Sequence, residues 1–255
     1  MKTIAIANNK GGVGKTTTAI SLAAMLAERG YRVLAVDIDQ QGGLTSGFGI
    51  NKNQPNILYD VFAGDVSIDD VIVKTDCYDL SLIPANVNLA ASNIELYEKE
   101  NGTYMLKESL TKISSEYDFA VIDCSPSVDQ ILFNALVASD YVVIPVQCEY
   151  YALEGLSRFI HIAKICNEKL SHSLIISGIL LTMYDSRSCL GREVIENVRE
   201  QAKFNVFETV IPRNVRLAEA PSYGKPINLY SPRSSGAKAY SAFTDEYLSI
   251  LNVKE

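Results

Sequence analysis

The chain has 255 residues, of which 47% are hydrophobic and 21% are charged, and its formal net charge is −7. This length and hydrophobic content can bury a full core, so we expect one large domain over residues 1–255 rather than a disordered chain. No secretory signal follows Met1, and no apolar stretch approaches the roughly 20 residues of a membrane span. We therefore expect a cytoplasmic protein.

The net negative charge argues against nucleic-acid binding through bulk electrostatics, because a basic domain is the usual signature. The charge is unevenly distributed, however. Residues 181–240 carry 9 Lys and Arg against 6 Asp and Glu, whereas the rest of the chain carries 14 against 24. Any contact with DNA is therefore expected to come from the C-terminal quarter.

The cysteines are odd in number, far apart and without a Cys-x-x-Cys pair, which disfavours a zinc or iron–sulfur site. Free cysteine packs like a small hydrophobic residue. We expect buried, reduced thiols at all five positions, which are Cys77, Cys124, Cys148, Cys166 and Cys189.

Apolar, strand-like runs alternate with helical patterns along the chain. Strands are predicted at residues 3–7, 33–36, 80–83, 119–122, 141–145, 174–181 and 206–211. Helices are predicted at residues 17–28, 89–99, 104–115, 130–138, 152–168, 192–201 and 237–251. Residues 42–55 are rich in glycine and polar residues and are predicted to form a mobile loop. Continuously apolar strands between helices predict a doubly wound α/β fold with a mostly parallel sheet and helices on both faces.

A glycine-rich loop, Asn-Lys-Gly-Gly-Val-Gly-Lys-Thr-Thr, joins the first predicted strand to the first predicted helix. The inward-pointing N–H groups of such a loop and the positive end of the helix dipole bind polyphosphates. Lys15 is expected to reach the β- and γ-phosphates, and the Thr16 hydroxyl is expected to bind Mg²⁺. The residues predicted to bind the nucleotide here are Lys10, Gly11, Gly12, Val13, Gly14, Lys15, Thr16 and Thr17.

This loop carries two lysines where an ordinary phosphate loop carries one. The usual pattern requires glycine at position 9, but Asn9 stands there and Lys10 follows it. Because Lys15 already serves the local phosphates, we interpret Lys10 as directed toward the nucleotide of a second, facing subunit. A solvated lysine in a glycine-rich turn is the alternative.

Acidic residues follow two predicted strands at the edge where parallel sheets bind their ligands. Asp37 and Asp39 follow the second strand, and one of them could orient the water that attacks the γ-phosphate, or cap a helix or loop. Asp123 follows strand 119–122, as the Walker B carboxylate that holds Mg²⁺ directly or through water does. With the phosphate loop, these acids indicate Mg²⁺-dependent hydrolysis of a nucleoside triphosphate.

Three segments closely resemble the ParA/Soj partition ATPases: residues 10–17 resemble the deviant Walker A loop, 37–42 the switch segment and 123–126 the Walker B segment. The similarity continues through residues 145–156, 181–187 and 211–227. The resemblance implies that Lys10 touches the partner's nucleotide in an ATP-sandwich dimer. It further implies that Lys10, Lys15 and Asp39 serve catalysis, with Asp39 orienting or activating the attacking water, and that Asp123 is an outer-shell Mg²⁺ carboxylate.

The resemblance also implies binding partners. Pro212 and Asn214 would frame the adenine, and Arg187, Arg213 and Arg216 would contact non-specific DNA only when two subunits pair. A ParB-type centromere-binding protein would stimulate hydrolysis, and the protein would associate with the nucleoid. Gln40, Gly43 and Ser125 depart from the family pattern beside the catalytic acids, which makes the hydrolysis rate and partner coupling the properties most open to change.

Three other activities fit parts of the pattern. A MinD-like membrane-positioning ATPase shares Lys10 but requires a basic amphipathic tail, whereas the last predicted helix carries Asp245 and Glu246. This favours the absence of a membrane partner. A metabolite ligase or synthetase on the same scaffold would need an additional substrate pocket. A non-hydrolysing nucleotide switch is compatible with the unusual residues around Asp39.

Overall fold

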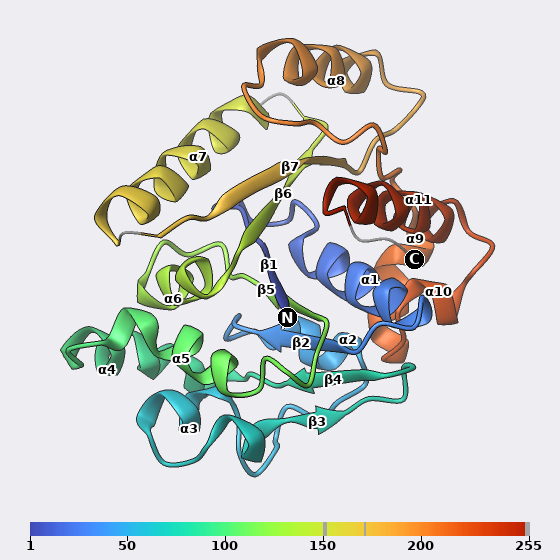
Figure 1. Cartoon of the computed structure of the whole chain (residues 1–255). Coiled ribbons are helices and arrows are strands. Elements are labelled where there is room, and N and C mark those ends of the chain that lie inside the picture. Colours follow the sequence, from blue (N-terminus) through green and yellow to red (C-terminus); the bar gives the residue numbers. More distant parts are fainter. Residues whose placement is uncertain (150–151, 171, 253–255) are drawn as a thin grey trace.

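The computed structural model describes residues 1–149, 152–170 and 172–252, and its centre is a seven-stranded sheet, which Figure 1 shows between the helices. The strand order is β3-β4-β2-β5-β1-β6-β7, and every neighbouring pair is parallel except β3 and β4. The strands are β1 (Lys2–Ile6), β2 (Val33–Asp37), β3 (Val73–Lys74), β4 (Leu80–Ile83), β5 (Phe119–Asp123), β6 (Tyr141–Gln147) and β7 (Ile175–Thr182). The predicted doubly wound, mostly parallel fold is confirmed.

Helices cover both faces of this sheet (Figure 1). The α-helices are α1 (Lys15–Glu28), α2 (Gly43–Gly47), α3 (Leu58–Ala63), α4 (Ser92–Glu98), α5 (Met105–Lys112), α6 (Gln130–Ala138), α7 (Ala152–Lys169), α8 (Cys189–Gln201), α9 (Val215–Glu219), α10 (Ile227–Tyr230) and α11 (Ser235–Ile250). Short 3-10 helices are η1 (Ile68–Val71), η2 (Val87–Ala91), η3 (Gly102–Tyr104) and η4 (Ala220–Tyr223). In the described part of the chain, no helix has both the length and the apolar character needed to cross a bilayer.

Side-chain alternation along the strands divides the core into two apolar clusters. Ile4 and Ile6 of β1 pack in the cluster formed with α1 and α11, whereas Ala5 packs in the cluster formed with α3, α4, α5, α6 and α7. Each strand therefore needs apolar residues at consecutive positions, because both of its faces are covered. This explains why the central strands are continuously apolar in sequence.

Strand register brings two acidic residues together at the carboxyl edge of the sheet. In the pairing of β2 with β5, Asp37 lies opposite Asp123, and in the pairing of β1 with β5, Ile6 lies opposite Asp123. The phosphate loop leaves the sheet directly after β1. The fold thus places the loop and the acids of two neighbouring strands at one point.

The strand predicted at residues 206–211 is wrong. Val206 makes an isolated bridge with Ile179, and Pro212, directly after the segment, makes another with Tyr184, so there is no continuous ladder over the described residues 206–211. The Glu246 carboxylate of α11 accepts hydrogen bonds from the Glu208 and Thr209 amides at 2.7 and 3.0 Å. A side chain from a distant helix therefore satisfies amides that a further strand would otherwise bind.

Residues 42–55 were predicted to be a loop, but they begin with α2. Gly42 has φ of +60°, and a Cβ there would lie 2.7 Å from the Ala85 carbonyl oxygen, so this turn requires glycine. Leu44 and Thr45 are buried. Tertiary contacts thus hold a helix in a segment whose composition favours a loop.

The prediction of five buried thiols is wrong at one position. Cys77, Cys124, Cys148 and Cys166 are buried free thiols, and burial raises the pKa of each. Cys189 is exposed. It is the first residue of α8, which starts three residues before the predicted boundary because Ser188 caps the helix through the Gly191 amide.

Candidate nucleotide-binding and hydrolysis site

The loop between β1 and α1 has the geometry of an anion cradle. Gly12 and Gly14 have φ of +75° and +93°, in the left-handed region that favours glycine. A Cβ added at Gly11 or Gly12 would meet no heavy atom within 4 Å, so the space above the loop is open. No side chain caps the α1 N-terminus and no acidic residue lies in its first turn. Its amides are therefore available to phosphate.

Lys15 lies within this loop. Its side chain is 7% exposed, and Nζ donates a hydrogen bond to the Lys10 carbonyl oxygen at 3.0 Å. Burial lowers the pKa of Lys15, and the charges of Asp123, Cys124 and Asp39 oppose that shift. A bound polyphosphate would supply the anionic partner that the buried ammonium lacks.

Asp123 provides a buried carboxylate without a hydrogen-bond partner. Both of its oxygens are inaccessible, and neither accepts a hydrogen bond from the part of the chain that the structure describes. Burial first, and then the charge of Asp37, raise its pKa well above the usual range; the nearby Thr16 hydroxyl, without a well-formed hydrogen bond, and the charge of Lys15 oppose this rise. An unpaired carboxylate beside the Thr16 hydroxyl is the oxygen environment that Mg²⁺ prefers, so these residues fit the ion.

Asp37 and Asp39 have different surroundings. Asp37 is fully buried and accepts hydrogen bonds from the Thr45 amide, the Thr45 hydroxyl and the Asp39 amide at 2.8, 2.7 and 3.1 Å. Burial raises its pKa to about 6. Asp39 is partly exposed, and its Oδ1 accepts a hydrogen bond from the Gln41 amide at 2.9 Å. Asp37 therefore holds α2 in place, whereas Asp39 is the accessible acid.

Gly43, one of the residues that depart from the family pattern, lies beside the metal-binding candidate Thr16. A Cβ at Gly43 would lie 3.1 Å from Cγ2 and 3.5 Å from Oγ1 of Thr16. Ser125 is buried and Gln40 is exposed. The glycine leaves the Thr16 hydroxyl uncovered, where a longer side chain would touch it.

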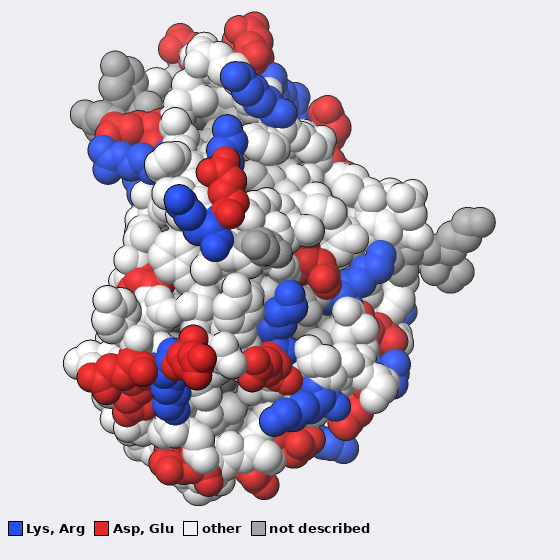
Figure 2. All heavy atoms as spheres, turned by 60° about the vertical axis from the view of Figure 1, so that its left-hand side comes forward, with Lys and Arg blue, Asp and Glu red and all other residues white. Residues whose placement is uncertain are grey.

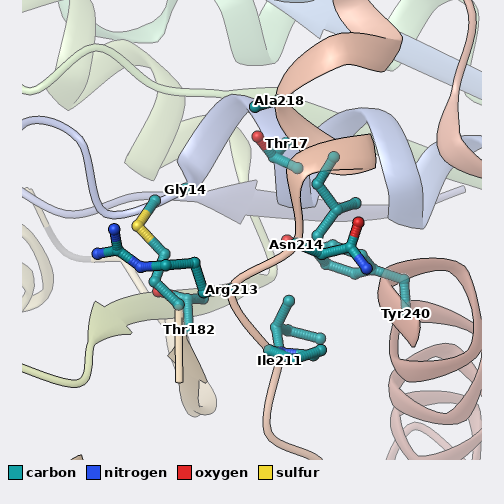
Figure 3. Close-up of a pocket in the computed structure, with 11 residues that line it drawn as sticks. Gly14, Thr17, Thr182, Ile211, Arg213, Asn214, Ala218 and Tyr240 are labelled. Carbon is teal, nitrogen blue, oxygen red and sulfur yellow. The ribbon is translucent and has the colours of Figure 1, made fainter. Parts of the chain in front are cut away.

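A cavity of about 250 Å³ lies beside the phosphate loop, and both predicted adenine-framing residues line it (Figure 3). Its lining residues are Gly14, Thr17, Thr182, Met183, Ile211, Pro212, Arg213, Asn214, Leu217, Ala218 and Tyr240. The Asn214 side chain also accepts from the Arg216 amide at 2.8 Å and donates to Ser235 at 2.7 Å. Pro212 and Asn214 are thus fixed at the edge of an apolar pocket.

Residues distant in sequence complete this pocket. Tyr240 of α11 is buried, and its hydroxyl lies 2.9 Å from Oγ1 of Thr18. Met183 has φ of +55°, which is unusual for a residue with a side chain. Thr182 donates a hydrogen bond to the Val13 carbonyl oxygen at 2.8 Å. The end of β7 is thereby attached to the phosphate loop.

Lys10 points to a different environment from Lys15. Its Nζ lies 3.9 Å from Oε2 of Glu149, and the side chain is one-third exposed. The same carboxylate lies 4.0 Å from Arg213. Glu149 thus lies between the extra loop lysine and one of the predicted DNA-binding arginines. Tyr150 and Tyr151, which follow it in the family-like segment, lie outside the described residues.

All three predicted DNA-binding arginines are exposed, and each has an acidic neighbour. Arg187 pairs with Asp185 and Arg216 pairs with Glu219, both at 2.8 Å, while Arg213 faces Glu149. Figure 2 shows a face on which basic and acidic side chains are interspersed, with uncharged areas between them. This face carries no continuous basic surface.

Known proteins are similar to this chain over most of its length. Residues 1–176 match a family model described as an AAA domain. The chain is 51% identical over 240 residues to the sporulation initiation inhibitor protein Soj of Bacillus subtilis, covering 94% of this chain and 95% of that protein. It is 45% identical over 246 residues to the chromosome partitioning protein ParA of Myxococcus xanthus, covering 96% and 87%.

Among solved structures, cobyrinic acid a,c-diamide synthase of Mycobacterium smegmatis with a bound ATP analogue and magnesium is similar with a TM-score of 0.87. The identity is 34%, and the match covers 99% of this chain and 96% of that chain. The fold, the phosphate loop and the strand-end carboxylates define the chain as a P-loop ATPase. More narrowly, the chain belongs to the ParA/Soj family of partition ATPases.

Proposed function

We propose that this ATPase segregates chromosomal or plasmid DNA by forming an ATP-sandwich dimer that binds DNA and is released after hydrolysis. The observation that carries the proposal is the separation of the two loop lysines. Lys15 lies inside its own loop, whereas Lys10 lies partly exposed beside Glu149. Of the two, Lys10 is therefore the lysine that can reach a facing subunit.

Hydrolysis is assigned to the residues around the phosphate loop. Magnesium, when bound, supplies charge neutralisation at the phosphates, and Thr16 and Asp123 would hold it. Lys15 binds phosphate oxygens, and Asp39 orients the attacking water. Asp39 suits this task because it is accessible, whereas the neighbouring Asp37 is fully occupied by hydrogen bonds.

DNA binding is assigned to the dimer. On one subunit the charges of Arg187, Arg213 and Arg216 are offset by nearby acids, and the chain carries a net charge of −7. A single subunit is therefore a poor ligand for a polyanion. Affinity for DNA rises steeply with the number of phosphate contacts, so two aligned subunits bind where one does not.

The remaining assignments follow from the family. A ParB-type centromere-binding protein stimulates hydrolysis, and residues 1–255 act as one P-loop ATPase domain in the cytoplasm, associated with the nucleoid. The names of the relatives, Soj and ParA, support this placement.

A ligase or synthetase activity is the second candidate, because one of the similar solved structures is that of a synthase, cobyrinic acid a,c-diamide synthase. Its identity to this chain is 34%, against 51% for Soj. ATP-dependent DNA retention separates the two activities. For a synthetase, we expect no increase in DNA retention when ATP is added.

Asp39→Ala tests the cycle directly. We expect ATP binding to remain, ATP turnover to fall by about 100-fold or more, and DNA-bound protein to persist longer because the ATP dimer is trapped. Turnover measured by phosphate release and DNA retention measured by filter binding check this. Loss of ATP binding in this variant contradicts the role assigned to Asp39.

Arg216→Glu tests the DNA surface. We expect ATP turnover without DNA to stay within about twofold of wild type, while DNA affinity falls and depends less steeply on salt, because fewer phosphates are contacted. Arg158→Glu is the matched control, since Arg158 is an exposed arginine paired with Glu154 but lies outside the predicted DNA surface. Equal effects of the two variants on DNA binding argue against a specific role of Arg216.

A further inference from the structure

One exposed apolar surface is not used by the nucleotide site. Helix α4 buries Ser92 and Leu96 completely, but Ile94 and Tyr97, three positions apart on its outer side, are 69% and 84% exposed. Single exposed apolar side chains are common, whereas adjacent ones that line a groove indicate a contact surface. The groove between α4 and α6 has a volume of about 480 Å³.

The charge of this groove is acidic. Of the residues that the structure describes, Glu98 and Asp129 line it, and no lysine or arginine does. Among the described residues, neither acid takes part in a salt bridge. Lys99, the adjacent base, donates to the carbonyl oxygens of Phe62 and Ala63. The surface therefore combines apolar contacts with unpaired negative charge.

The groove is joined to the segment that follows the Walker B acid. Asn93 of α4 donates to the Asp129 carboxylate at 3.2 Å and accepts from the Ile131 amide at 3.2 Å. Asp129 caps α6 through the Leu132 amide at 3.0 Å. Only five residues separate Asp129 from Asp123. A ligand that displaces α4 would therefore move the start of α6 and act on the metal-binding acid.

We propose that the groove lined by Asn93, Ile94, Tyr97, Glu98, Asp129 and Phe133 is the docking site for an amphipathic, basic segment of the protein that stimulates hydrolysis. This deepens the proposed function and rests on it. Apolar side chains of that segment contact Ile94 and Tyr97, and its lysines or arginines pair with Glu98 and Asp129. Attraction between opposite charges gives the contact its selectivity.

The same charges disfavour other occupants. In a two-fold symmetric contact that pairs the groove with itself, Glu98 and Asp129 would face the same acids of the second copy. DNA would be repelled by Glu98 and Asp129. A basic protein segment is the complementary ligand.

The test uses Ile94→Ser and Glu98→Lys in the full-length protein, with Ile175→Ser and Glu116→Lys as matched controls. Ile175 is 54% exposed and starts β7, Glu116 is exposed and follows α5, and neither residue lines the groove. ATP turnover is measured with DNA across concentrations of the ParB-type protein. Thermal melting checks that each variant is folded.

We expect basal turnover and ATP-dependent DNA retention to remain within about twofold of wild type in all four variants. The half-maximal concentration of the ParB-type protein should rise by about tenfold or more in Ile94→Ser and Glu98→Lys only. Unchanged stimulation overturns the groove assignment. Loss of the ATP dimer in sedimentation, or of DNA retention, overturns it in favour of a self-association or DNA surface. Absence of stimulation in wild type instead contradicts the proposed function itself.

Discussion

Lys10→Ala should abolish ATP-dependent DNA retention while ATP binding to the isolated subunit stays within about threefold of wild type. The variant should lose only the contact between the Lys10 side chain and the nucleotide of the facing subunit. In one subunit the Lys10 side chain faces Glu149 at 3.9 Å, and its backbone carbonyl, not its ammonium, contacts Lys15. Removing the side chain therefore leaves the subunit's own phosphate site intact.

Lys15→Ala is the control that separates the two lysines. Its Nζ lies buried in the loop, so its removal should weaken ATP binding itself and, through it, every later step. Nucleotide affinity is measured by titration with a fluorescent ATP analogue, and dimer formation by sedimentation with ATP. If Lys10→Ala and Lys15→Ala weaken ATP binding equally, Lys10 acts within its own subunit and the facing-subunit role is wrong.

Glu149 explains how the loss at Lys10 could spread to DNA binding. Its carboxylate lies near both Lys10 and Arg213, at 3.9 and 4.0 Å. A nucleotide of the facing subunit that attracts Lys10 would change the charge balance around Arg213. These pairs are exposed and contribute little to stability. Their effect is on the local charge offered to DNA.

The sequence was sufficient where a function depends on residues that are contiguous or lie at strand ends. The phosphate loop and Asp123 are found from glycine spacing and from an acid after an apolar run, because chain connectivity alone brings them together. The register that places Asp37 opposite Asp123 follows from parallel neighbours. Two of the three hydrogen bonds that occupy Asp37, however, come from Thr45 of α2, in a segment that composition predicted to be a loop.

Other parts of the site depend on long-range packing and have no local signal. Tyr240 lines the pocket because α11 packs against α1. Its hydrogen-bond partner Thr18 is 222 residues away in the sequence. The segment 206–211 reads as a strand by composition, yet a carboxylate from α11 occupies its amides. In the sequence, Asn93 is an ordinary polar residue of a helix; its hydrogen bond to Asp129 depends on the position of α6. Each case requires the position of a distant helix.

Asp123→Asn should have opposite effects on stability and activity. Without nucleotide and magnesium, we expect the variant to be more stable than wild type by about 2 kcal/mol, since it removes a buried charge whose oxygens have no partner. For a chain of this length that corresponds to a rise of about 4–8 °C in the melting temperature. ATP turnover should fall by about 10–100-fold, because a carboxylate that supports the metal is lost.

The pH dependence of stability tests whether the buried charge of Asp123 causes the difference between Asp123→Asn and wild type. The pKa of Asp123 is raised in the folded state, so between the unfolded pKa near 4 and the folded pKa the native protein binds more protons than the unfolded chain. Wild-type stability therefore falls as pH rises through that window. The advantage of Asp123→Asn should be large at pH 8 and vanish toward pH 4, as measured by denaturant titration at each pH.

Asp37→Asn is the matched control at the neighbouring strand end. Asp37 is equally buried, but it accepts three hydrogen bonds, two of them from Thr45. An asparagine amide keeps only one acceptor oxygen, so its NH₂ group would face at least one of these donors, and this variant should lose about 1–3 kcal/mol of stability. If Asp123→Asn is also destabilised without magnesium, its carboxylate is satisfied in the free protein. The orphaned oxygens would then no longer support a metal site.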